Sequence, residues 1–148
     1  MRIRNLRKED FFLLNEMDWT PLPKERDSIY LFLALDQTDC SFVAEEGSRF
    51  LGVLLCTRSS DGKSIYVNHL LVDRKVRKKG VGGKLLQRLH EFAERAGVER
   101  IWLLAYDDLK SYYQRQGYRE AYEFLSPELK EYLSNQKKSL AFVKYFTN

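Results

Sequence analysis

The sequence predicts a single mixed α/β domain, with a mostly antiparallel, twisted sheet of about seven strands flanked by four to five helices. Residues 41–72 hold three strand-like stretches joined by short, glycine-containing turns, which is typical of an antiparallel meander. Residues 81–96 carry an apolar stripe at helical spacing that ends at Gly97. A short apolar strand at 100–104 follows that helix, so we expect it to pair in parallel with the strand at 64–72.

The other elements follow from periodicity and turn signals. A weakly alternating strand at 2–6 precedes helices at 9–17 and 29–35, the second with Ser28 as a candidate N-cap. A helix at 109–116 ends at Gly117, and a strand is expected at 118–125. Ser126 and Pro127 begin a short helix, and 140–146 is the last strand. The sequence has no repeats or low-complexity linkers, so we expect residues 1–148 to form one domain.

The composition is that of an ordinary globular protein, 44% hydrophobic and 31% charged, with a net charge of +4. Its two cysteines, Cys40 and Cys56, form no metal-binding pattern with the two histidines, so we expect no metal. Neither a secretory leader nor a membrane-length apolar run is visible, which favours a cytoplasmic protein away from membranes. Positive charge gathers at one turn rather than along a face, which argues against nucleic acid as a partner.

That basic turn is the most informative segment, and it joins a predicted strand to the predicted helix at 81–96. Backbone N–H groups at a helix start lack partners and favour an anion, and glycine lets a ligand approach them. The spacing fits neither a P-loop nor a dinucleotide fingerprint, because both fail at Leu85. The turn consists of Arg77, Lys78, Lys79, Gly80, Val81, Gly82, Gly83 and Lys84. By itself it fits a solvent-exposed helix start as well as a phosphate-binding site.

A second motif decides between these interpretations. The spacing of Arg77, Gly80 and Gly82 resembles the coenzyme A loop of the GNAT (N-acetyltransferase) superfamily. Residues 112–118, Tyr-Tyr-Gln-Arg-Gln-Gly-Tyr, are similar to that family's F-Y-x-x-x-G-F signature, with tyrosines at both Phe positions. The two motifs occur in the family's order, with a helix and a strand between them. The chain therefore resembles a GNAT acyltransferase along nearly its whole length.

The resemblance implies direct transfer of an acyl group, most often acetyl from acetyl-CoA, to a primary amine of a small molecule, peptide or protein within a ternary complex. The run 77–84 would hold the coenzyme's diphosphate. Main-chain groups at Leu70, Leu71 and Val72 would hold pantetheine and polarise the carbonyl. Tyr113 would contact the coenzyme and protonate the departing thiolate.

The group that removes the acceptor's proton is less defined. The family often has Glu or His at the positions of Tyr66 and Asn68, and here these two residues are candidates for fixing a water that takes the proton. His69 is a further candidate for the base, because a histidine can take up a proton near neutral pH. Strand alternation, however, places Tyr66, Asn68 and Leu70 on one face and His69 on the other, away from the acceptor, unless a bulge reverses the faces. The resemblance places the acceptor among six aromatic or proline residues, namely Trp19, Pro21, Tyr30, Phe32, Tyr122 and Phe124. Of these, Phe32 and Phe124 are expected to belong to the core instead.

Two further roles stay open on sequence grounds. Without an acidic base, the domain could be a coenzyme A-binding sensor that lost its transferase activity. The segment 126–138 is longer than a hairpin requires, and it could cover the acceptor pocket or join a homodimer.

Overall fold

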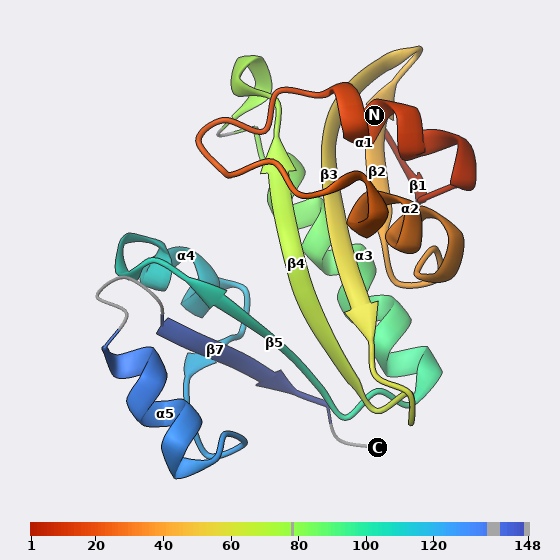
Figure 1. The fold of residues 1–148 in the computed structure, drawn as a ribbon. Helices are drawn as coiled ribbons and strands as arrows, with labels where there is room; N and C mark the ends of the chain where they lie inside the picture. The colour runs from red at the N-terminus through yellow and green to blue at the C-terminus, as the bar shows by residue number, and fades with distance from the viewer. Residues whose placement is uncertain (78, 136–139, 147–148) are drawn as a thin grey trace.

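A seven-stranded sheet in the order β1-β2-β3-β4-β5-β7-β6 forms the centre of the structure (Figure 1). The structure, a computed structural model, describes residues 1–77, 79–135 and 140–146. Neighbouring strands pair antiparallel except β4 and β5, which are parallel. This confirms the predicted sheet and its parallel pair. The strands are β1 Arg2–Asn5, β2 Phe42–Glu46, β3 Arg49–Arg58, β4 Ser64–Val72, β5 Arg100–Ala105, β6 Arg119–Glu120 and β7 Leu140–Tyr145.

Helices cover both faces of the sheet. α3 packs on one face, while α1 and α2 pack on the other face over β2 and β3 (Figure 1). Each face therefore has its own buried cluster of apolar side chains. The described helices are α1 Phe11–Glu16, α2 Asp27–Asp36, α3 Val81–Ala96, α4 Lys110–Arg115 and α5 Pro127–Ser134, with 3-10 turns η1 Lys8–Asp10, η2 Arg74–Val76 and η3 Asp107–Leu109.

The apolar stripe of α3 fixes this helix against the sheet. Leu85, Leu86 and Leu89 are fully buried, and each contributes about 2 kcal/mol by leaving water. The helix ends where Gly97 adopts a left-handed conformation with φ of 72°, as the sequence predicts. Its N-terminus is thereby held at a fixed place beside the end of β4.

Two predicted elements differ from the observed ones. α2 begins at Asp27 after an extended Arg26, so Ser28 lies inside the first turn and is not the N-cap. The strand predicted at 118–125 pairs only at Arg119 and Glu120. Beyond it the chain turns, with the N–H of Leu125 donating to the carbonyl of Tyr122 at 2.9 Å, and Ser126 then accepts a hydrogen bond from the N–H of Leu129 and begins α5. Residues 136–138 of the predicted covering segment lie outside the described residues.

An ion pair fastens α1 to the edge of the sheet. Arg4 of β1 donates hydrogen bonds of 2.8 and 3.0 Å to the carboxylate of Asp10, which also accepts from the N–H of Arg7 at 2.8 Å. Both side chains are nearly buried. Burial pushes the pKa of Asp10 up, but the bonds from Arg4 and Arg7 outweigh it and lower the pKa overall.

We predict that Asp10→Asn lowers the free energy of unfolding by about 2 kcal/mol at pH 7, because bonds to a charged acceptor are lost. A carboxyl whose pKa is lowered in the folded state stabilises above its unfolded pKa of about 3.9, and that contribution disappears as the pH falls through the folded value. The difference between the two proteins should therefore shrink below about pH 4. Urea denaturation of both proteins at neutral and at acid pH measures this difference in the free energy of unfolding. An equal difference at both pH values would contradict the assignment.

Candidate active site

β4 and β5 separate within the sheet, and the site forms at that separation. They pair at Ser64–Arg100, Ile65–Ile101 and Tyr66–Trp102, and no further pairing joins them in the described residues. Figure 1 shows the two strands side by side at one end and apart at the other. From residue 67 to Val72 the edge of β4 that faces β5 is therefore free of strand partners. An open strand edge presents backbone donors and acceptors to an extended ligand.

Asn68 forms a β-bulge in the middle of β4. β3 pairs Leu55 with His69 and Cys56 with Val67, so Asn68 has no partner on that strand. The extra residue reverses the alternation. Val67 packs in the cluster under α3, and Leu70 packs against that same cluster. His69, in contrast, contacts Trp19 on the α1–α2 face. The predicted faces are therefore wrong beyond Asn68, and His69 shares the face of Tyr66.

The start of α3 presents unpaired backbone donors. Gly80 is the N-cap, with a left-handed φ of 82° that favours glycine, and it has no side chain to cap the helix. The first bond of the helix runs from the N–H of Lys84 to the carbonyl of Gly80 at 3.1 Å. The N–H groups of residues 81–83 thus have no acceptor within the helix, which makes this end suitable for an anion. Lys78 of the predicted run lies outside the described residues.

A cavity of about 410 Å³ opens beside this helix start. Tyr112 and Tyr113 of α4 form its far side. A Cβ on Gly82 would lie 2.9 Å from the hydroxyl oxygen of Tyr112, so any larger residue would push the Tyr112 side chain aside; glycine here leaves space rather than permitting a positive φ. The lining also includes predicted coenzyme-binding residues, namely Leu70, Leu71, Val72, Arg77, Gly80, Val81, Gly82 and Gly83.

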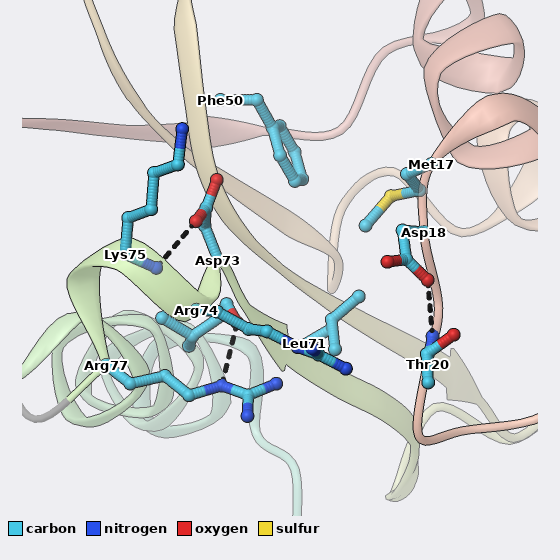
Figure 2. Close-up of a pocket in the computed structure, with 10 residues that line it drawn as sticks. Met17, Asp18, Thr20, Phe50, Leu71, Asp73, Arg74, Lys75 and Arg77 are labelled. Atoms are coloured by element: carbon cyan, nitrogen blue, oxygen red, sulfur yellow. Dashed lines mark hydrogen bonds between the residues drawn. The ribbon is translucent and has the colours of Figure 1, made fainter.

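Several basic residues lie near the start of α3, but of these Arg77 lines the cavity, whereas the predicted binding residues Lys79 and Lys84 are not part of its described lining. Arg77 donates a hydrogen bond from Nε to the carbonyl of Val72 at 3.3 Å and lines a second hollow of about 290 Å³ (Figure 2). Figure 2 shows Arg74 and Lys75 on the same side of that hollow, across from Met17, Asp18 and Thr20. The salt bridges found in the described part of the chain involve none of Arg74, Lys75, Arg77, Lys79 and Lys84.

A smaller cavity of about 130 Å³ lies between the separated strands. It adjoins the larger one, since Leu22, Leu70, Leu109 and Tyr113 line both. Burial raises the pKa of Tyr113, so its phenol stays protonated at neutral pH. The sequence could not indicate Leu22 as a lining residue, because it comes from a loop without a motif.

The two remaining catalytic candidates lie on the same stretch of β4. Asn68 lines the smaller cavity, and its amide oxygen accepts a hydrogen bond from the Thr57 hydroxyl at 2.8 Å. That bond leaves the amide nitrogen as the group that can donate to a ligand or water. Tyr66 lies two residues earlier, with its ring 4.5 Å from that of Trp102. Both side chains are thus held by neighbours from adjacent strands.

The six predicted acceptor residues do not gather around one pocket. Trp19 and Tyr30 are buried and stacked at 5.3 Å, and they belong to the α1–α2 cluster. Phe32 points outward and is 40% exposed, so its expected place in the core is wrong. Phe124 packs edge-on against Trp102. The other two are Pro21, which lines the larger cavity, and Tyr122, whose hydroxyl donates to Glu120 at 2.9 Å.

The profile of the acetyltransferase (GNAT) family matches residues 1–118. The chain belongs to the GNAT acetyltransferase family. This confirms the predicted family, and the match ends at Tyr118, the last residue of the second motif.

Individual relatives agree with this assignment. The chain is 30% identical over 112 residues to the uncharacterized protein YdhI of Bacillus subtilis, covering 68% of each sequence. Its fold is similar to Ard1 of Thermoplasma volcanium, with a TM-score of 0.79, 16% identity and coverage of 99% and 98%. For Naa50 of Arabidopsis thaliana, in complex with the bisubstrate analogue CoA-Ac-MVNAL, the TM-score is 0.76 at 16% identity, with 98% of each chain covered. The diaminobutyrate acetyltransferase EctA of Paenibacillus lautus, with its substrate and coenzyme A, gives 0.72 at 16% identity, covering 99% and 96%.

The described residues contain neither a candidate metal site nor a membrane-spanning helix. No group of three or more His, Cys, Asp or Glu side chains is placed to hold a metal ion. Within the same residues, no helix has both the length and the apolar character that crossing a membrane requires.

We predict that Gly82→Ala weakens coenzyme A binding about tenfold, or 1.4 kcal/mol, because the new methyl group and the Tyr112 hydroxyl compete for space on the cavity wall. Calorimetric titration with coenzyme A measures the affinity. The free energy of unfolding should stay unchanged or rise by up to about 1 kcal/mol, since alanine favours a helix.

The matched control is Gly83→Ala, one residue along the same turn. Its Cβ would lie 3.3 Å from the end of the flexible Gln116 side chain, which can move aside. Its affinity for coenzyme A should change less than threefold, or about 0.6 kcal/mol. Adding Tyr112→Phe to Gly82→Ala removes the crowding hydroxyl and should restore binding. Equal losses in both single variants would show that Tyr112 is not the cause.

Proposed function

We propose that this protein transfers an acyl group, most simply acetyl, from coenzyme A to a primary amine by direct attack in a ternary complex. The observation that carries the proposal is the adjoining pair of cavities, which meet at Tyr113 and run from the start of α3 to the separation of β4 from β5. One cavity has an anion-binding helix start, and the other has an open strand edge. A diphosphate-bearing thioester fits both features at once, within a family of acetyltransferases.

In the proposed complex the larger cavity holds the donor. The N–H groups of Val81, Gly82 and Gly83 receive the diphosphate, and the cations Arg77, Lys79 and Lys84 add a positive field. Pantetheine lies along the open edge of β4 at Leu70, Leu71 and Val72. Backbone N–H groups there stabilise negative charge on the thioester oxygen in the transition state, since they are fixed before the reaction.

Within that complex, the amine must attack as a neutral nucleophile. A C–N bond forms, the C–S bond breaks with its electrons going to sulfur, and Tyr113 gives its phenolic proton to the thiolate. Asn68 is placed to hold a water or the acceptor through its amide nitrogen. For Tyr66 we propose contact with the acceptor, because it lies on the α1–α2 face beside Trp102.

The acceptor class rests on the neighbours. Naa50 is in complex with an analogue that joins coenzyme A to a peptide, and EctA is bound to diaminobutyric acid. Amines of both kinds are therefore candidates here, as small molecules or at a peptide N-terminus. We further propose a cytoplasmic location, supported by two buried, unpaired cysteines, as a reducing compartment would keep them. A homodimer, and the exclusion of nucleic acid and membranes as partners, stay predictions.

A coenzyme A-binding sensor is the second candidate. It is favoured by the lining of the smaller cavity, which in the described residues includes no carboxylate to serve as a base. Calorimetry with coenzyme A, run beside thiol release from acetyl-CoA with a panel of small amines and short peptides, separates the two. Thiol release that depends on the amine supports the transferase. Binding of coenzyme A without turnover on any amine would favour the sensor, and absence of binding would contradict both.

We predict that Tyr113→Phe lowers kcat about 100-fold, which is the usual size of a general-acid contribution. The affinity for coenzyme A should change less than threefold, or about 0.6 kcal/mol, because the ring that lines both cavities remains. Steady-state rates beside calorimetric titration separate these effects. Full activity of the phenylalanine variant would remove Tyr113 from the chemistry.

A further inference from the structure

His69 of β4 and Glu25 of the α1–α2 loop form a pair on the acceptor face of the sheet. Nε2 of His69 lies 3.4 Å from a carboxylate oxygen of Glu25. The side chains are 12% and 39% exposed, so the histidine is nearly enclosed and the carboxylate reaches solvent. His69 is on this face only because the bulge at Asn68 reverses the strand.

Aromatic residues hold both members of the pair in place. The ring of Trp19 lies 5.3 Å from that of His69 and stacks on Tyr30 at 5.3 Å with an interplanar angle of 7°. The N–H of Glu25 donates a hydrogen bond of 2.8 Å to the Tyr30 hydroxyl, which fixes the loop. This arrangement accounts for the burial of two predicted acceptor residues, since Trp19 and Tyr30 support the pair rather than form the pocket wall.

The surroundings keep the imidazole neutral and able to accept a proton. Burial lowers the pKa of His69, while Glu25 works in the opposite direction without cancelling the effect. A proton on Nε2, facing the carboxylate, leaves the lone pair on Nδ1. The other titratable groups nearby are Tyr30 of α2, Tyr66 of β4, Tyr113 of α4 and Tyr106, which follows β5 and lines the same cavity. Burial raises the pKa of Tyr30, Tyr66 and Tyr113, so these three add no charge at neutral pH.

We propose that the Glu25–His69 pair takes the proton from an aliphatic ammonium acceptor and so generates the attacking amine. His69 also lines the cavity between β4 and β5, together with Tyr113. The pair therefore lies beside the cavity where the thioester would react, on the side from which the α1–α2 loop approaches. The inference rests on the proposed transferase function.

Protons balance in this scheme. The acceptor nitrogen loses two protons in forming the amide. The first goes to Nδ1 of His69 and leaves to solvent past the exposed Glu25. The second, released as the tetrahedral intermediate collapses, restores the phenol of Tyr113, which has given its own proton to the departing sulfur.

The scheme implies that the pair is needed only by acceptors that arrive protonated. An aliphatic amine is an ammonium ion at pH 7, whereas hydroxylamine is already neutral there. The test therefore compares these two acceptors with wild-type protein, His69→Gln and Glu25→Gln. His90→Gln is the matched control, because that histidine lies on α3, where its Nε2 is 2.9 Å from the Tyr118 hydroxyl.

For His69→Gln at pH 7, kcat/KM for the aliphatic amine should fall about 100-fold, and for hydroxylamine less than threefold, as expected when only a general base is lost. The affinity for coenzyme A should be unchanged. The rate with the aliphatic amine should keep rising with pH where the wild-type rate levels off. In Glu25→Gln the rise of the rate with increasing pH should begin at a lower pH than in the wild type, because the group that raises the pKa of His69 is gone. His90→Gln should resemble the wild type with both acceptors.

The outcomes are distinct. Equal losses with both acceptors, or none with either, would overturn the role of the pair while leaving the transferase intact. Unchanged pH profiles in both variants would do the same. A wild-type chain that binds coenzyme A but acylates neither acceptor would overturn the proposed function and, with it, the inference.

Discussion

The separation of β4 from β5 after Tyr66 and Trp102 is the constraint on which the rest of the site depends. While paired, the two strands form a closed part of the sheet. Once apart, they leave backbone groups of β4 open, and they make room for the smaller cavity. β4 then leads into the turn that begins α3, so the open edge and the helix start lie in sequence along one path. A donor with a diphosphate at one end and a thioester at the other matches that path.

Rigid packing makes the helix start useful for binding. Three fully buried leucines on α3 hold the helix against the sheet, and Gly52 of β3 leaves room for it, since a Cβ there would lie 3.4 Å from the side chains of both Val81 and Leu85. Donors that are already in position cost little reorganisation when an anion arrives. The glycines of the turn serve different ends, since Gly80 is needed for its positive φ and Gly82 for the space beside Tyr112. One short segment thus combines backbone conformation, close approach and positive charge.

The sequence predicted α3 and most of the strands, because those elements depend on local periodicity and on glycine at defined positions. The assignment of residues 77–84 to the coenzyme stays a prediction. Sequence reasoning failed where one residue changes a long-range relation. Nothing in the strand 64–72 marks Asn68 as a bulge, so a strict two-residue alternation turned His69 to the wrong face. The contact between Glu25 and His69 joins a loop to a strand 44 residues away, and no local pattern encodes it. Phe32 looked like core because α2 is apolar all round, yet it faces solvent.

The most direct test of the central claim follows the backbone N–H resonances of Val81, Gly82 and Gly83 during parallel titrations with coenzyme A and with pantetheine, which lacks the diphosphate. We expect coenzyme A to shift these three resonances strongly, and pantetheine to leave them nearly unchanged while it shifts those of Leu70, Leu71 and Val72. Coenzyme A binding that saturates without moving the amides of residues 81–83 would contradict it.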